Sequence, residues 1–226
     1  MLKFKKKFAR NLTINNIEQS FEITKRKKMP KIVNRDDYRE ELLRKSFQLF
    51  ARKGYSKVTI REISKELGVS TGTLYHYFEN KEVLFEQMVR LLVREDVNEL
   101  KLMERRTKSQ TPEKIIEVLF QFIHSKEFYF QSVILMVSDI YRYNEEGHSL
   151  SVLKDCLVIY RNAISQHLNL ENKDLENMLL SVVIGSIFQR MLDPTGVNYS
   201  RVGAVLQKIY PFLTPNQMQE PQKIGN

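Results

Sequence analysis

The sequence predicts an all-α protein of about nine helices, with a small N-terminal domain and a larger C-terminal one. Apolar residues recur at helical spacing after residue 35, and no segment has the alternating polarity of a half-buried strand. Glycine, proline and capping residues divide this pattern into helix-length pieces. Apolar residues make up 42% of the 226 residues, a content typical of a folded chain that can bury two cores.

The first helix is expected at residues 36–53, where Leu43, Phe47 and Phe50 share one face and charged residues fill the other. Gly54 ends it, because glycine readily adopts the left-handed conformation found after a helix C-terminus.

Two short helices are expected next. A capping box begins the second helix at Thr59, whose hydroxyl can bond the backbone of Glu62 while the Glu62 carboxylate bonds back. Gly68 ends that helix, and Ser70 can cap a third one after a two-residue turn. Residues 59–78 therefore have the layout of a helix-turn-helix.

Further helices are expected in the C-terminal part. A long one runs from Lys81, behind the cap Asn80, to about residue 106, and Thr111-Pro112 opens the next. The others are expected at 128–143, 149–168, 172–192 and 198–213.

The net charge of +9 is unevenly placed. Residues 1–28 hold nine Lys or Arg against two Glu, a balance of +7, and residues 29–81 hold 11 basic and 7 acidic groups, a balance of +4. This leaves −2 for the rest of the chain, so any electrostatic attraction to nucleic acid belongs to the N-terminal third.

Three interpretations of residues 1–28 stay open. The one we slightly favour is that translation naturally begins at Met29 and this stretch is an upstream or disordered extension. The second is a basic arm that follows the DNA backbone or minor groove. The third is an amphipathic helix at a membrane surface.

Several function classes find no support in the sequence. The single Cys156 permits no internal disulfide, so a reducing cytoplasm is expected, and no apolar run reaches the roughly 18 residues of a membrane span. The four histidines have no partner at metal-ligand spacing, so we expect neither metal nor cofactor. The C-terminal part lacks the cluster of nucleophile, arginine and acidic residues that a recombinase would need, which argues against an enzyme.

The segment around the helix-turn-helix resembles the tetracycline-repressor (TetR) family of bacterial transcription regulators. The matching residues are Phe50, Gly54-Tyr55, Thr59, Ile63, Gly68-Val69-Ser70, Leu74-Tyr75-His76-Tyr77-Phe78 and Lys81. The resemblance implies a homodimer that binds a two-fold symmetric operator in double-stranded DNA, usually as a repressor released by a small-molecule effector. It also implies a DNA-binding domain at 36–96, a regulatory and dimerisation domain at 97–213, and a polar tail at 214–226.

The third helix is the expected reading helix. Thr71, Gly72 and Thr73 are small, so its first turn can sit deep in the major groove, where threonine hydroxyls bond base edges and methyls touch thymine. Thr59 and Lys81 stand at helix N-termini, which favour phosphate. The expected DNA contacts are Thr59, Arg61, Ser70, Thr71, Gly72, Thr73, Tyr75, His76 and Lys81.

The helix at 172–192 is apolar around nearly its whole circumference, so it must be covered on more than one side. In the family it would form a four-helix dimer interface with the helix at 198–213; the residues expected there are Leu175, Leu179, Val182, Val183, Gly185, Ser186, Val202, Val205 and Ile209. Phe120, Ile123, Ile134, Tyr141 and Tyr160 are candidates for a pocket that takes a small apolar or aromatic effector, although solid core is an equal reading.

Two alternative functions stay open at this stage. One is a non-specific architectural DNA-binding protein, which the basic N-terminal segment alone favours and which predicts steep salt dependence. The other is an activator with the same fold.

Overall fold

The computed structural model describes residues 34–107, 109–143 and 148–214, and these residues form nine α-helices and no strand. The helices are α3 (Arg35–Lys53), α4 (Ile60–Leu67), α5 (Thr71–Tyr77), α6 (Lys81–Arg105), α7 (Pro112–Ser125), α8 (Glu127–Tyr143), α9 (His148–Leu168), α10 (Lys173–Leu192) and α11 (Tyr199–Leu213). The predicted all-α fold is confirmed. Residues 1–28 and nearly all of the polar tail lie outside the described residues.

Short polar side chains begin most of these helices. Each accepts a hydrogen bond from a backbone N–H of the first turn, which stabilises a helix by about 1 kcal/mol. The capping residues are Thr59, Ser70, Asn80, Thr111, Asn172 and Asn198. The helix starts that the sequence predicts at Thr59, Ser70, Asn80 and Thr111 are therefore confirmed.

One hydrophobic core holds α3, α4 and α5 against the first half of α6. Phe50, Phe78 and Phe85 are almost wholly buried in it. Met136 and Ile140 of α8 belong to the same core. The helix-turn-helix end of the described chain is thus packed directly on a helix that lies far away in the sequence.

A second core joins α7, α9, α10 and α11. Gly203 allows α11 to approach α7, because a Cβ at this position would lie only 3.2 Å from the Phe120 ring. The buried Tyr210 hydroxyl donates to the carbonyl of Leu168 over 2.8 Å and ties α11 to the end of α9.

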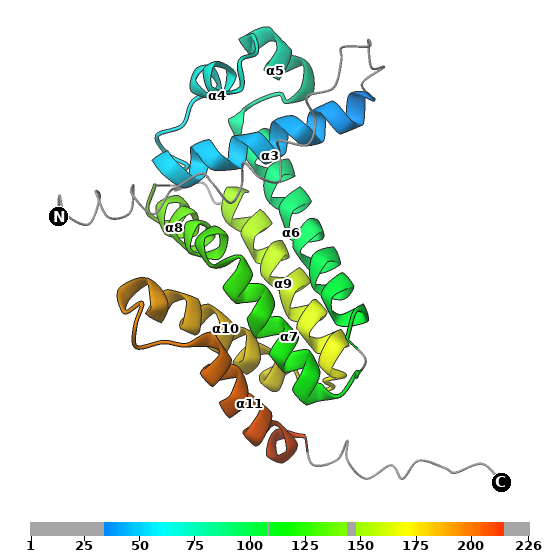
Figure 1. Ribbon diagram of the computed structural model, residues 1–226. Helices are drawn as coiled ribbons and strands as arrows, with labels where there is room; N and C mark the ends of the chain where they lie inside the picture. Colours follow the sequence, from blue (N-terminus) through cyan, green and yellow to red (C-terminus); the bar gives the residue numbers. More distant parts are fainter. Residues whose placement is uncertain (1–33, 108, 144–147, 215–226) are drawn as a thin grey trace. The chain divides into compact units, whose positions relative to one another are not determined.

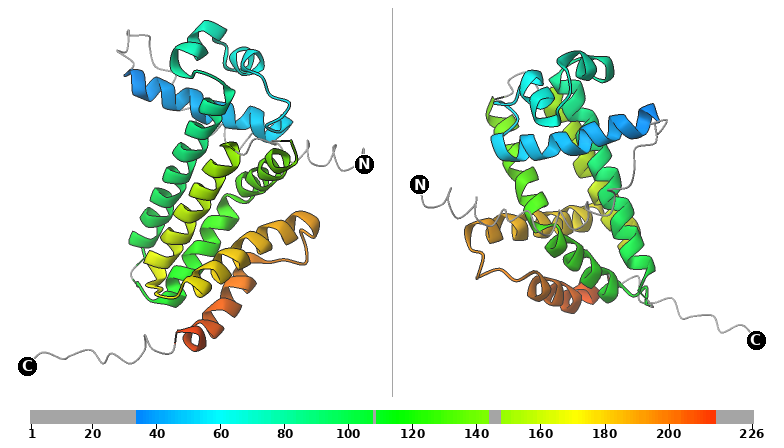
Figure 2. Two further views of the ribbon diagram at one scale, coloured as in Figure 1. Left: turned by 180° about the vertical axis from the view of Figure 1, so that it is seen from behind. Right: turned by 45° about the horizontal axis from the view of Figure 1, so that its top comes forward.

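The long helices α6 and α9 run side by side, with α7 and α8 next to them (Figure 1). The same arrangement is seen from behind in Figure 2, where α10 and α11 lie at the end of this group away from α4 and α5. The two C-terminal helices, α10 and α11, therefore lie apart from the helix-turn-helix.

By length and composition alone, α10 would be able to cross a membrane. It packs against α8, α9 and α11 in the described part of the chain, although only 17% of its most apolar stretch is buried there. This helix is weak evidence for a span, and its apolar circumference matches the sequence expectation.

Candidate functional site

A reciprocal capping box begins α4, and a glycine ends it. The Thr59 hydroxyl accepts from the Glu62 N–H at 3.3 Å, and the Glu62 carboxylate accepts from the Thr59 N–H at 3.0 Å. Gly68 follows α4 with φ +68°, a left-handed conformation that favours glycine. The capping box therefore fixes where α4 begins, and the left-handed Gly68 turns the chain towards α5.

The first turn of α5 faces solvent. The Ser70 hydroxyl accepts from the Thr73 N–H at 2.9 Å, and the hydroxyl oxygens of Ser70 and Thr73 are also 2.9 Å apart. Thr71 and Gly72 are exposed. A Cβ at Gly72 would meet only the Ser70 hydroxyl oxygen, at 3.6 Å, so nothing inside the chain requires a glycine there.

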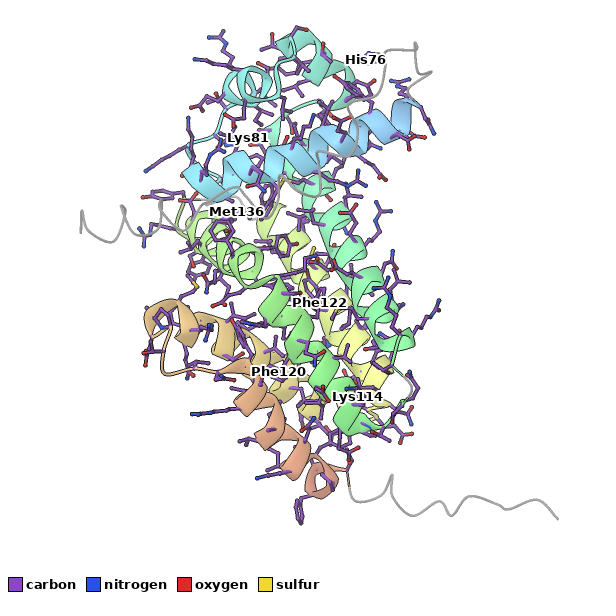
Figure 3. The ribbon with its side chains drawn as sticks, viewed as in Figure 1. His76, Lys81, Lys114, Phe120, Phe122 and Met136 are labelled. Carbon is purple, nitrogen blue, oxygen red and sulfur yellow. The ribbon has the colours of Figure 1, made fainter. Side chains whose placement is uncertain are left out.

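The opposite side of α5 anchors the helix. Leu74 is wholly buried, whereas Tyr75 is 58% exposed. His76 is exposed and lies edge-on to the Tyr77 ring, with centroids 5.2 Å apart (Figure 3). Together with the exposed Arg61 on α4, these side chains are accessible to a partner.

Lys81 stands at the N-terminus of α6, but its side chain has partners within the protein. The ammonium lies 4.3 Å from the centroid of the Tyr55 ring and donates to the Tyr55 carbonyl at 3.3 Å. Its positive charge therefore stays beside the N-terminus of α6, where the helix dipole already favours an anion.

Ion pairs join the end of α3 to α4. Lys53 contacts Glu62 at 2.7 Å, and Arg52 contacts Glu66. The hydrogen bond from Lys53, followed by that from the Thr59 backbone, lowers the pKa of Glu62. The contribution of this carboxylate to stability is present above its unfolded pKa and is lost as the pH falls through its lowered folded value.

Asp139 of α8 holds the loop that leads into α4. Its carboxylate accepts from the Ser56 N–H at 2.8 Å and from the Ser56 hydroxyl at 3.2 Å. Gly54, with φ +81°, leaves room for this carboxylate, because a Cβ there would lie 2.9 Å from an Asp139 oxygen. The loop three residues before the Thr59 cap is thereby tied to α8.

A cavity of about 380 Å³ lies among α6, α7, α8, α9 and α10, and Phe47 of α3 also lines it. Its walls are almost entirely aliphatic and aromatic. Of the pocket candidates from the sequence, Ile123, Ile134 and Tyr160 line it.

Two pocket candidates do not line this cavity. Phe120 packs in the second core against Gly203 of α11, whereas its neighbour Phe122 lines the cavity (Figure 3). Tyr141 is 78% exposed, because it points to solvent while its neighbour Ile140 enters the first core. The placing of these two residues in the pocket was wrong.

The cavity wall contains one carboxylate, that of Asp96, which is 1% exposed. Tyr160 donates to Asp96 Oδ2 at 2.5 Å, and Lys126 pairs with Oδ1. Lys126 also contacts Glu99 at 3.1 Å, and Tyr129 interacts with the Asp96 carboxylate. A polar cluster thus interrupts an otherwise apolar wall.

Burial governs ionisation in this cluster. Desolvation raises the pKa of Asp96 even though Lys126 acts in the opposite direction. Burial would lower the pKa of Lys126, but Asp96 and Glu99 raise it further, so the ammonium stays charged. Burial also raises the pKa of the Tyr160 phenol and lifts that of the Cys156 thiol to about 11.

Sequence reasoning missed Asp96, although a signal for it existed. It lies three residues after Val93 and four before Leu100, both buried, and so falls on the apolar stripe of α6. A carboxylate on such a stripe indicates a polar site within a core.

The residues expected at a dimer interface divide into three groups by exposure. Leu175, Leu179, Val183 and Ser186 are buried inside the chain's own second core or beside it, because α10 packs against α8 and α9. Val205 and Ile209 of α11 are 58% and 40% exposed. Val182 and Val202 are partly buried against the second core, and Gly185 is partly exposed with open space at its Cβ position.

The structure adds apolar residues to this surface that the sequence did not single out. We call the following set the α10–α11 apolar face: Met178, Ile184, Phe188, Leu192, Val205, Ile209, Phe212 and Leu213, each at least 36% exposed. Exposed apolar side chains gathered on neighbouring helices are typical of interaction surfaces. The sequence pattern showed that α10 must be covered on two sides, but not which residues lie on which side.

Comparison with known protein families gives one match in the region of the helix-turn-helix. Residues 42–88 fit the model of the bacterial regulatory proteins of the tetR family. The match covers α4, α5, most of α3 and the start of α6, and so includes most of the first core.

Two relatives from Bacillus subtilis extend the comparison. The chain is 24% identical to the HTH-type transcriptional regulator PksA over 212 residues, which cover 86% of this chain and 98% of PksA. It is 27% identical to the uncharacterized HTH-type transcriptional regulator YerO over 133 residues, which cover 57% of this chain but only 46% of YerO.

Among solved structures, the transcriptional regulator FadR from Bacillus subtilis in complex with stearoyl-CoA has the same fold. The TM-score is 0.56 at 15% identity, over 76% of this chain and 96% of FadR. The nine-helix arrangement is therefore that of known regulators.

Proposed function

We propose that this chain, which belongs to the TetR family of bacterial transcription regulators, is a sequence-specific DNA-binding homodimer that represses transcription until a small molecule releases it. The observation that carries the proposal is the first turn of α5. It presents Thr71 and Gly72 to solvent on a helix that Leu74 anchors from behind. Small hydroxyl-bearing residues on an exposed helix N-terminus suit base edges in the major groove.

Positioning contacts surround this turn. Thr59 and Lys81 lie at the N-termini of α4 and α6, where N–H groups and the helix dipole favour phosphate. Arg61, Tyr75 and His76 are exposed around the same end. Such contacts set the register of the protein on DNA and not the sequence it prefers.

The α10–α11 apolar face supports dimerisation. A second copy of the chain would bury Phe188 and Val205, which otherwise stay 48% and 58% exposed. Two reading helices about one DNA turn apart would then meet a two-fold operator, and the combined affinity far exceeds that of one domain.

Release by an effector is supported by the place of the cavity. Met136, Val137 and Ser138 of α8 line it, and the next residue, Asp139, holds the loop before the Thr59 cap. A ligand that shifts α8 would therefore move the loop that precedes α4. The FadR structure with stearoyl-CoA supports a small-molecule effector for this fold.

The test is binding of the purified chain to DNA from upstream of its own gene, with excess unrelated DNA, at about 150 mM salt, where non-specific affinity is about 10⁻⁴ to 10⁻⁶ M. Thr71→Ala removes an exposed hydroxyl and methyl. If each base contact is worth about 1 kcal/mol and the dimer has two, this variant binds roughly 30-fold more weakly. Thr195→Ala, the same change in the loop before α11, leaves the affinity unchanged.

Binding that the competitor removes, and that Thr71→Ala does not alter, would favour the non-specific architectural alternative. Deletion of residues 1–28 then decides the case, because that alternative assigns the affinity to the basic segment.

A further inference from the structure

The cavity extends along α6. On α6 it is lined from Phe85 to Leu100, 15 residues apart, which corresponds to about 22 Å along a helix. A volume of about 380 Å³ along that length accommodates an extended hydrocarbon chain.

Its polar cluster lies near one end. Asp96 is 4 residues from Leu100 and 11 from Phe85, so about 16 Å of apolar cavity extends from it towards α3. An extended chain advances about 1.2 Å per bond, and this stretch therefore holds roughly 13 bonds.

The charges around Asp96 exclude an anion. Lys126 is the nearest cation, and it is already shared between the carboxylates of Asp96 and Glu99. Among the described residues that line the cavity there is neither lysine nor arginine. The groups that face the cavity here are carboxylate and phenol oxygens with lone pairs to spare, and they suit a neutral hydrogen-bond donor.

We propose that the effector is a single-chain aliphatic molecule of about 12 to 16 carbons with a neutral hydrogen-bond donor, such as a hydroxyl, at the end that meets Asp96, Tyr129 and Tyr160. The inference rests on the proposed effector-controlled function and names the chemical class of that effector. The tail lies along α6 and reaches Phe47 and Phe85, two of the residues that the cavity shares with the first core.

The test uses the full chain without DNA. Octan-1-ol, tetradecan-1-ol, octadecan-1-ol and tetradecanoate compete with the neutral dye Nile red, and native mass spectrometry of the same mixtures counts the bound molecules. Complete burial tightens Kd about fourfold per methylene. We therefore expect tetradecan-1-ol to bind at least about 100-fold more tightly than octan-1-ol, octadecan-1-ol to gain nothing more, and tetradecanoate to bind at least about tenfold more weakly.

Two pairs of variants locate the site. Val97→Phe fills the cavity and abolishes alcohol binding, while Asn98→Phe, on the exposed side of the same turn, leaves it intact. Tyr160→Phe reduces the preference for the alcohol over tetradecanoate. Tyr199→Phe, which removes a buried hydroxyl with no hydrogen-bond partner, does not.

Equal affinity for alcohol and carboxylate, no dependence on chain length, or no bound alcohol in the mass spectra would each overturn the inference. Operator binding by the same preparations separates the two levels. If the chain binds its operator but no alcohol, it is a regulator with an effector of another class. If it binds alcohols but no specific DNA, the proposed regulatory function is refuted and the proposed ligand class is not.

Discussion

Gly72→Ala separates what the fold needs from what DNA binding needs. The new methyl would meet only the Ser70 hydroxyl oxygen at 3.6 Å, an ordinary van der Waals distance. Gly72 lies within α5, and alanine in a helix is more stable than glycine by about 0.5 to 1 kcal/mol. For a chain of this size the melting temperature rises by roughly 1 to 4 °C.

Affinity for the operator should change in the opposite direction. The methyl would project from the exposed turn that is proposed to approach the bases, and it would hold the neighbouring threonines away from them. Loss of one contact of about 1 kcal/mol in each half-site of a dimer weakens binding roughly 30-fold.

The assay pairs differential scanning fluorimetry with a fluorescence anisotropy titration on operator DNA. Asn98→Ala is the matched control, because it raises helix propensity at an exposed position of α6 away from α5. A Gly72→Ala chain that is more stable and binds the operator as well as wild type would refute the placing of this turn at the bases. A Gly72→Ala chain that is less stable than wild type would refute the inference that the fold does not require a glycine at this position.

Three further outcomes are expected. Phe188→Glu places a charge on the α10–α11 apolar face and yields a monomer in sedimentation. Leu102→Glu, at an exposed leucine of α6, is the control and stays dimeric. A Phe188→Glu variant that stays dimeric would contradict the interface. Asp139→Ala loses its hydrogen bonds to the loop before α4, which are worth about 1 kcal/mol, so the melting temperature falls by roughly 2 to 4 °C. We also expect that effector no longer releases this variant from DNA, as measured by anisotropy in the presence of effector. At pH 8, iodoacetamide labels Cys156 at least about 100-fold more slowly in the folded chain than in urea, because burial raises its pKa to about 11 and only the thiolate reacts; equal rates by mass spectrometry would contradict its burial.

The helices could be predicted because their signals are local. Thr59 and Ser70 cap the helices they precede, Gly68 turns the chain between them, and the apolar spacing of each segment fits a helix. The family resemblance, carried by the same short region, agrees with the match over residues 42–88.

The cavity could not be predicted as well, since it depends on how helices distant in sequence pack. Phe120 and Phe122 are both buried on α7, yet one packs on α11 and the other lines the cavity. Composition cannot distinguish these two faces of a helix that is covered on both. Asp96 would have been found by asking which charged residue falls on a buried stripe.

The first core limits how this regulator can be rebuilt. Because Met136 and Ile140 of α8 fill the space beneath α3 and α6, a helix-turn-helix cut out at residue 96 would leave a hole in its own interior. The helix-turn-helix segment is therefore not an independent domain that can be fused alone to another effector domain. A working chimera has to carry the α8 segment with it, or replace both residues by side chains that fill the same volume.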